Sequence, residues 1–173
     1  MPGRTEELAS DALGQVKKAK AAIEGVSGVF KKLMEEHGQV TALLMRVKIS
    51  SDPGIRRELF PTIRKELLAH ERGELREVYP VLKQHAETAS LARDHDHEAA
   101  QLEQAIEQLH VTAVEDPGWG AKFEQLVELI QHHTQEEEND YFPAAQQVLG
   151  DVQAKALQAR YERTKAEITK QLG

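Results

Sequence analysis

The sequence contains no cysteine among its 173 residues. That absence excludes disulfides, thiolate metal sites, iron–sulfur clusters and cysteine nucleophiles, and it fits a reducing cytoplasm. The chain also lacks an apolar run near the roughly 20 residues that cross a bilayer, and its polar amino terminus lacks the apolar core of a signal peptide. We therefore expect a cytoplasmic protein with no membrane partner.

Strand-forming segments are equally scarce, because β-branched runs are few and the apolar periodicity is helical nearly throughout. The predicted helices span residues 5–26, 29–48, 55–84, 88–111, 119–148 and 150–173. Short turns between long helices predict antiparallel neighbours. We therefore expect an all-α fold in a single domain, 1–173, built on an up-down antiparallel four-helix bundle over 28–148. The flanking segments, 1–26 and 150–173, are predicted to be additional amphipathic helices.

Each flanking helix has an apolar stripe at helical spacing. The stripe of the first consists of Leu8, Ala12, Val16, Ala19 and Ile23. The stripe of the last consists of Ala154, Leu157, Tyr161, Ile168 and Leu172. We expect these faces to cover the bundle or to join two copies of the chain, so the sequence leaves a monomer and a homodimer open.

Acidic residues and histidines gather in the middle of the chain. Residues 33–150 have a formal net charge of −11, whereas residues 1–32 and 151–173 have +2 each. All eight histidines lie in this middle part, from His37 to His133. An acidic centre disfavours nucleic acid as a partner, which attracts basic surfaces. Carboxylates and imidazoles together indicate cation binding instead.

An internal repeat relates two segments that lie 63 residues apart. Residues 70–80 align with residues 133–143, so that a His, a Glu four residues later, an aromatic at nine and a Pro at ten all coincide. The offset is two helices long. The central part of the chain is therefore predicted to consist of two helical hairpins in series.

A histidine interrupts the apolar stripe of each of the four central helices. These residues are His37, His70, His95 and His133, and Glu74 and Glu137 follow one turn after the second and fourth. No Lys or Arg occupies a stripe position to neutralise the two carboxylates, and burying an unpaired carboxylate costs several kcal/mol. A bound cation removes that cost, because imidazole and carboxylate are natural metal ligands. A metal-free structural bundle is the alternative.

Other motifs fit the residues less well. The four remaining histidines, His85, His97, His110 and His132, are out of phase or distant and are expected at the surface. His70-Glu71 begins like a zinc-protease helix, but Glu74 stands where the second His is needed. Ferritin-type bundles need two inward Glu-x-x-His pairs, and only Glu107 and His110 have that spacing. No nucleophile triad, phosphate loop or dinucleotide fingerprint is present, so no catalytic or organic-cofactor residue is predicted.

The pattern of six residues resembles the hemerythrin-like, His-His-Glu cation-binding domains, over residues 28–148. The resemblance implies a four-helix bundle around a non-haem di-iron centre with an oxo or hydroxo bridge. It implies that Glu74 and Glu137 bridge two iron ions. The terminal ligands would be His37, His70, His95 and His133.

The chain departs from the oxygen-carrying hemerythrins at two positions. Those proteins have a second histidine on the third helix, where Ala99 stands, and a carboxylate five residues after the last histidine, where Glu138 stands. Glu138 lies about 140° around the helix from His133, so Glu137 is the better placed. The missing imidazole leaves a coordination position open or filled by Glu98 or Tyr141.

The resemblance implies a protein that binds or reacts with a small oxidant: oxygen, peroxide or nitric oxide. A catalase-like reaction suits a narrow bundle, because it needs no organic substrate pocket. The alternative is a module that senses or stores iron or oxygen without turnover. The sequence leaves open whether the protein is an enzyme.

Overall fold

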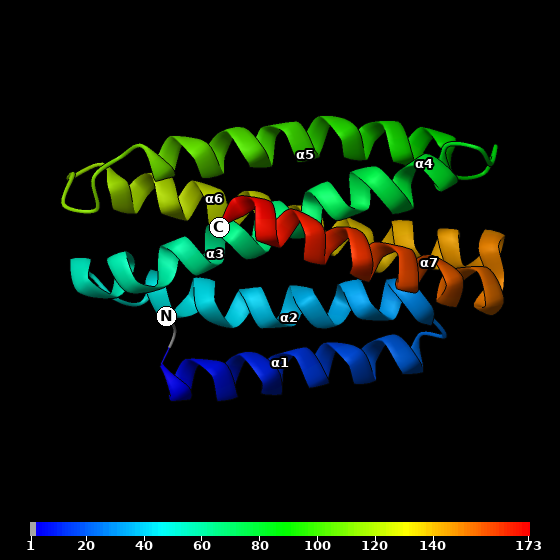
Figure 1. The fold of residues 1–173 in the computed structure, drawn as a ribbon, viewed down its shortest axis with the longest axis horizontal. Coiled ribbons are helices and arrows are strands. Elements are labelled where there is room, and N and C mark those ends of the chain that lie inside the picture. Colours follow the sequence, from blue (N-terminus) through cyan, green and yellow to red (C-terminus); the bar gives the residue numbers. More distant parts are fainter. Residues whose placement is uncertain (1–2) are drawn as a thin grey trace.

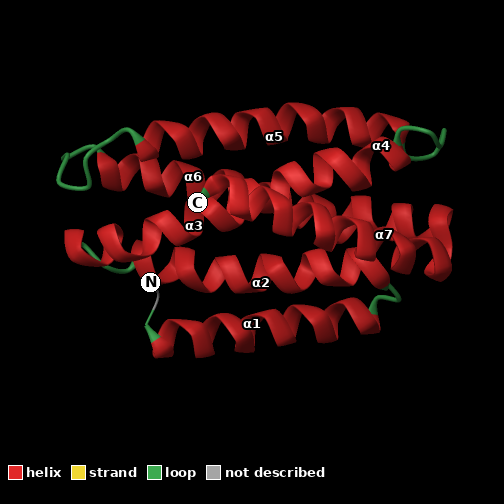
Figure 2. Cartoon of the chain, in the orientation of Figure 1, coloured by secondary structure: helices red, strands yellow, loops and turns green. Residues whose placement is uncertain are grey.

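The computed structural model describes residues 3–173, so Met1 and Pro2 of the expected domain lie outside the described residues, as do the side chains of Ala22 and Ile23. Across 3–173 the chain forms helices and turns without a strand (Figure 2), which confirms the all-α prediction. The elements in chain order are α1 (Arg4–Ile23), α2 (Gly28–Lys48), α3 (Pro53–Gly73), η1 (Glu74–Val78), α4 (Tyr79–Leu82), α5 (Ala89–His110), α6 (Trp119–Glu136), η2 (Glu137–Tyr141) and α7 (Phe142–Leu172).

The long helices lie side by side along the long axis of the molecule (Figure 1). α1 lies at one edge against α2, and α5 lies at the opposite edge against α6. The direction of the chain reverses at the turns that follow α1, α2, α4 and α5, and α7 turns back at Gly150 (φ 75°, ψ 172°) to pack on α2 and α3. None of the helices described is long and apolar enough to cross a membrane.

Two apolar cores occupy the two ends of the helix assembly. One contains Phe30, Leu33, Leu82, Phe142 and Tyr161, among others. The other contains Leu44, Ile63, Ile106, Trp119 and Phe123, among others. Along α2, along α5, and along α6 with its continuation η2, the predicted inward-facing histidine lies between residues of the two cores. These histidines therefore lie in a polar layer that apolar side chains enclose on both sides along the helix axes.

Two π-helical turns, η1 and η2, begin at Glu74 and Glu137, the equivalent carboxylates of the internal repeat. Each turn precedes a proline at the second residue of the next helix, Pro80 or Pro143. Proline has no N–H and its ring clashes with the carbonyl four residues earlier, so the helix widens. The N–H of Tyr79 accordingly bonds to the carbonyl five residues back. The two segments of the internal repeat therefore share a backbone geometry as well as a sequence pattern.

The π turns also shift the helical phase by one residue. In an unbroken α-helix the apolar stripes of Glu74 and Glu137 would continue through Val81 on one helix and through Ala144 and Val148 on the other, but these side chains are only partly buried. Their successors are buried instead: Leu82, Ala145 and Leu149. A π turn holds one more residue than an α turn, which explains the displacement in both copies of the repeat.

The predicted apolar face of α1 was wrong. Leu8 and Val16 are 64% and 63% exposed, because α1 turns a different face to α2. The helices approach closely where two glycines stand: a Cβ on Gly38 would lie 2.5 Å from the carbonyl oxygen of Leu13, and Gly14 is buried. Close backbone approach therefore decides the orientation of α1 in place of its larger apolar residues.

The second half of α7 buries four of the five residues of the stripe that was predicted for it, and the fifth, Leu172, is partly buried. Ala154, Leu157, Tyr161 and Ile168 are all buried. Gly73 provides the space for Tyr161, since a Cβ there would lie 2.7 Å from the Tyr161 ring. This helix consequently carries a tyrosine hydroxyl into the polar layer.

Candidate metal centre

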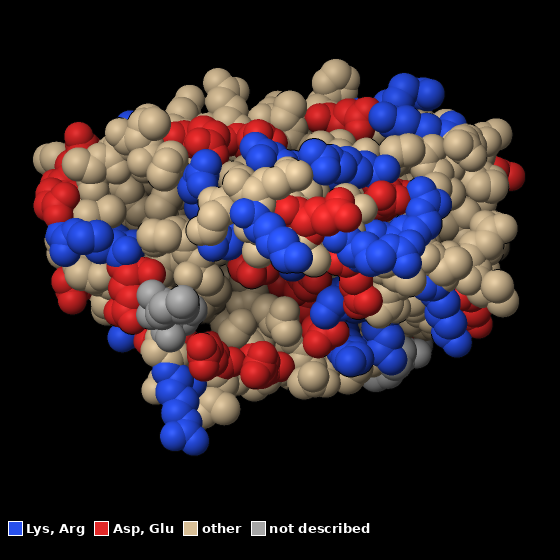
Figure 3. Space-filling model, viewed as in Figure 1, with Lys and Arg blue, Asp and Glu red and all other residues tan. Residues whose placement is uncertain are grey.

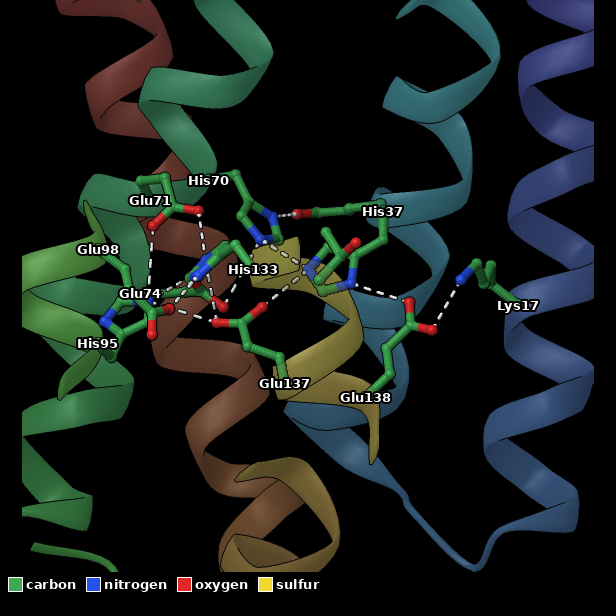
Figure 4. A network of polar contacts seen from close by, with 12 residues as sticks. Lys17, His37, His70, Glu71, Glu74, His95, Glu98, His133, Glu137 and Glu138 are labelled. Carbon is green, nitrogen blue, oxygen red and sulfur yellow. Dashed lines mark hydrogen bonds and ion pairs between the residues drawn. The ribbon is translucent and has the colours of Figure 1, made fainter. Parts of the chain in front are cut away.

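Four helical segments bring the six predicted ligands into one buried layer (Figure 4). The six are His37 from α2, His70 and Glu74 from α3 and η1, His95 from α5, and His133 and Glu137 from α6 and η2. Both carboxylates and His95 are fully buried. Figure 4 shows the imidazoles and carboxylates pointing toward one another from separate helices.

Glu74 and Glu137 each face histidines on two sides. One oxygen of Glu74 lies 3.5 Å from Nε2 of His70, and the other lies 3.4 Å from Nε2 of His95. Oε2 of Glu137 lies 3.1 Å from Nε2 of His37, and Oε1 lies 3.3 Å from Nε2 of His95. A carboxylate that directs its two oxygens in this way is placed to contact two cations at once.

The donor atoms form two groups of four, and within each group they all lie within 4.8 Å of one another. The first group consists of His37, His70, Glu74 and Glu137, and the second group consists of Glu71, Glu74, His95 and His133. Glu74 belongs to both. Mixed imidazole and carboxylate donors suit several divalent metals, so either group has the chemistry to hold a metal ion.

Sequence reasoning missed Glu71 as a candidate ligand. Its side chain is 5% exposed, and Oε1 lies 3.0 Å from Nε2 of His133. The residue lies 100° around α3 from His70, so it faces α5 and α6 rather than α2. One signal was available: Glu71 stands four residues from both Leu67 and Leu75, in the middle of an apolar column.

The two side chains suggested for the missing imidazole lie behind His133. Oε2 of Glu98 is 2.8 Å from Nδ1 of His133, and the hydroxyl of Tyr141 donates to Oε1 of Glu98 at 3.3 Å. Neither belongs to the two groups. His97 is exposed, as expected.

Three of the four histidines have a carboxylate on Nδ1. Glu138 lies 3.0 Å from His37 and Glu36 lies 2.9 Å from His70, and Glu98 supports His133. A donated Nδ1–H fixes the tautomer and turns the Nε2 lone pair inward, as in the carboxylate–histidine pairs of metal sites.

His95 is held differently. Within residues 3–173 neither of its ring nitrogens has a hydrogen-bond partner. Its ring stacks on Tyr79 with centroids 3.4 Å apart and planes 7° apart. The Tyr79 hydroxyl donates to Oε1 of Glu137 at 2.7 Å. The stacked ring, rather than a carboxylate, therefore fixes the orientation of this imidazole.

Buried donor atoms without a partner test whether this layer fits a cation. Within the layer, partners among residues 3–173 are lacking for both oxygens of Glu74, one oxygen each of Glu71 and Glu137, and Nε2 of His95 and His133. Outside the layer, one buried atom each of Arg56, Asp96 and Trp119 also lacks a partner among these residues. Each unsatisfied buried polar group costs about 1–3 kcal/mol, and more when it is charged. The atoms of the layer all belong to residues of the two groups, so bound cations would satisfy them together.

Charge within the layer shifts its protonation. Burial disfavours a charged imidazole, but the carboxylates beside His37, first among them Glu137, raise its pKa to about 9. The carboxylates around His95 likewise outweigh burial and raise its pKa to about 11. Burial and the charge of Glu137 raise the pKa of Glu74. Without a cation, the layer therefore holds protons at neutral pH that a metal would displace.

A family model decides what this arrangement is. The model described as the hemerythrin HHE cation-binding domain matches residues 28–145. The chain belongs to this hemerythrin family. The matched residues contain both donor groups, so the hemerythrin assignment and the buried layer refer to the same part of the molecule.

Comparison with curated proteins adds a relative of this hemerythrin-like chain. A protein named "DNA nickase" from Nostoc sp. (strain PCC 7120) is 25% identical over 138 residues, which cover 80% of this chain and 39% of that relative. The chain therefore spans about two fifths of the relative's length. No solved structure matches the chain.

Helices outside the hemerythrin match extend the hydrogen-bond network. From α1, Lys17 Nζ lies 2.7 Å from Oε2 of Glu138 (Figure 4). From α7, the hydroxyl of Tyr161 donates to Oε2 of Glu36 at 2.6 Å, and Lys165 Nζ lies 3.2 Å from its Oε1. Both carboxylates behind the first group are thus held by side chains from the flanking helices.

Proposed function

We propose that the chain holds two iron ions, one in each donor group, inside an up-down four-helix bundle over residues 28–148. Glu74 and Glu137 would bridge the ions. His37 and His70 would complete the coordination of one ion, and Glu71, His95 and His133 would complete the coordination of the other. The observation that supports this assignment is the orientation of the two carboxylates. Each directs one oxygen toward a histidine of the first group and the other oxygen toward a histidine of the second group.

We further propose that this iron pair binds or reacts with a small oxidant: oxygen, peroxide or nitric oxide. Sites with few histidine and carboxylate donors keep positions for exogenous ligands, and the proposed assignment gives one ion four such side chains and the other ion five. Iron supplies the redox chemistry. The protein would hold the ions through these side chains, it encloses the layer between two apolar cores, and it orients three imidazoles through their Nδ1 hydrogen bonds.

Metal analysis together with the absorption spectrum of purified protein tests the assignment. We expect about two irons per chain and a spectrum that changes when peroxide or nitric oxide is added. Glu74→Ala and His133→Ala should lower the iron content, whereas His97→Ala, an exposed residue of the same type, should not. Loss of iron in His97→Ala, or full iron in Glu74→Ala, would contradict the assignment.

An iron or oxygen sensor without turnover is the alternative use of the same site. The contacts of Lys17 and Tyr161 favour it, because they connect both flanking helices to carboxylates that contact histidines. Light scattering with and without iron, together with peroxide decay, separates the two uses. Fast decay with unchanged assembly supports reaction, and a change of assembly without decay supports sensing.

DNA nicking is a separate candidate, favoured by the likeness to the Nostoc protein. The net charge of −11 on residues 33–150 argues against it. Conversion of supercoiled plasmid to the nicked form by the iron-loaded protein is the test. A peroxide scavenger should be present, since free iron and peroxide cleave DNA without an enzyme. Nicking that survives the scavenger and disappears in Glu74→Ala would establish the activity.

A further inference from the structure

A cavity of about 380 Å³ opens beside the two donor groups. Its inner wall includes His37 and His70 of the first group and Glu71 and His133 of the second. Nε2 of His133 and Oε2 of Glu71 have no hydrogen-bond partner among the described residues. The cavity thus reaches residues of both groups, and its two partnerless donor atoms belong to the second group.

Five buried aliphatic side chains line the cavity, beside the uncharged polar residues Ser10, Gln39, Thr62 and Thr134. The aliphatic residues are Val40, Leu43, Leu67, Leu102 and Ile130, and each is at most 8% exposed. An ion that passes such a wall loses hydration without compensation, which costs several kcal/mol. An uncharged small molecule meets no such cost.

The outer part of the cavity is acidic. Glu7 and Asp11 from α1 are exposed, and Glu66 from α3 is 44% exposed. Lys165 also lines the cavity, but Glu66 and the buried Glu36 share its ammonium group at 3.0 and 3.2 Å. Its charge therefore does not offset Glu7 and Asp11. Figure 3 shows a hollow on this face between α1 and α7, with acidic atoms on its rim.

We propose that this cavity is the route by which small molecules reach the iron pair, and that it selects uncharged ones. Oxygen, nitric oxide and hydrogen peroxide belong to that class, whereas superoxide, azide and nitrite do not. The proposal rests on the proposed function, because it names the kind of ligand that the same site takes. An acidic entrance repels anions before they meet the aliphatic wall, so charge and desolvation act in the same direction.

Association rates of azide and nitric oxide with the iron-loaded protein test the selection. In the double variant Glu7→Gln/Asp11→Asn we expect azide to associate about threefold faster at low ionic strength and the difference to vanish in high salt. Nitric oxide should associate at the unchanged rate. Glu162→Gln/Glu167→Gln is the matched control, since it removes two exposed carboxylates of α7 that do not line the cavity.

Changes at Leu43 test the route itself. Leu43→Phe should slow nitric oxide association at least severalfold at unchanged iron content, and Leu43→Ala should accelerate it, so one variant remains informative if the other does not fold. In the metal-free protein, xenon should shift the methyl resonances of Leu43 and Ile130, because apolar cavities bind xenon.

Three results would overturn the proposal. Nitric oxide rates that ignore both Leu43 variants would exclude the route, and azide rates that respond equally to the double variant and to its control would exclude the selection. Iron content is measured first. Wild-type protein that loads no iron would refute the proposed function and this inference with it, whereas full iron with unaltered rates would refute the inference alone.

Discussion

The two donor groups differ in what stands behind their histidines. In the first group, His37 and His70 each have a buried carboxylate on Nδ1. In the second group, His133 relies on Glu98, whose side chain is 27% exposed. Nδ1 of His95 has no partner within residues 3–173. One half of the centre is therefore supported by buried hydrogen bonds and the other half is not.

The support of the first group comes from outside the hemerythrin match. Lys17 holds Glu138, and Tyr161 and Lys165 hold Glu36, and all three lie outside the matched residues 28–145. A carboxylate fixed in this way orients the imidazole and raises its basicity as a ligand. We therefore expect the first group to bind its cation more tightly than the second.

Removing Glu71 should have the largest effect on the difference between the two groups, because Glu71 is the one carboxylate that belongs to the second group alone. In Glu71→Gln we expect iron to fall from about two ions per chain to about one. The remaining ion should be the one in the first group. Metal analysis after gel filtration gives the content, and circular dichroism shows whether the helices persist.

Glu58→Gln is the control for that variant, since Glu58 is an exposed carboxylate on the same helix. Its iron content should equal that of the wild type. Two ions retained in Glu71→Gln would mean that this carboxylate is no ligand. Loss of both ions would mean that the second group cannot empty without the first.

Tyr161→Phe should have a smaller effect, and that effect should be confined to the first group. It removes a hydroxyl that donates to Glu36 at 2.6 Å, while the ring continues to fill the space beside Gly73. Outer hydrogen bonds of this kind are worth roughly tenfold or more in metal affinity. We expect the affinity of the first group to fall about tenfold, as measured by competition with a chelator, with the second group unchanged.

Tyr141→Phe is the matched variant on the other side, because Tyr141 donates to Glu98 behind His133 at 3.3 Å. This contact is longer and only partly buried, so it should matter less, and any loss should fall on the second group. Equal losses in both groups from both tyrosine variants would remove the distinction between the two halves.

Helical phase alone was sufficient to predict which histidines face inward. His37 and His95 interrupt apolar stripes, and the face of a helix on which a residue lies is a local property of the sequence. The inward direction of Glu71 depended on where α5 and α6 lie relative to α3, which no single stripe records. The carboxylates that contact Nδ1 of the histidines could not be predicted for the same reason, since Glu36 and Glu138 contact histidines of other helices.

Local rules also failed where the backbone departed from the α-helix. The repeated prolines were visible in the sequence, but the widened turns before them moved the buried positions from Val148 to Leu149 and from Val81 to Leu82. The face of α1 failed differently, because the close approach of Gly38 to Leu13 outweighed the burial of Leu8. Tertiary contact set the orientation there.

Proton release should distinguish the two groups more weakly still. The pKa of His37 is raised to about 9 and that of His95 to about 11, so both imidazoles hold protons at pH 7 in the metal-free protein. A metal must displace these protons, so apparent affinity should rise with pH, by about tenfold per unit for each proton displaced. The dependence should weaken for the first group above pH 9 and persist for the second. Calorimetry with ferrous iron under argon, in two buffers of different ionisation enthalpy, counts the protons. Release that is absent at pH 7, or that changes in His97→Ala, would contradict the assignment.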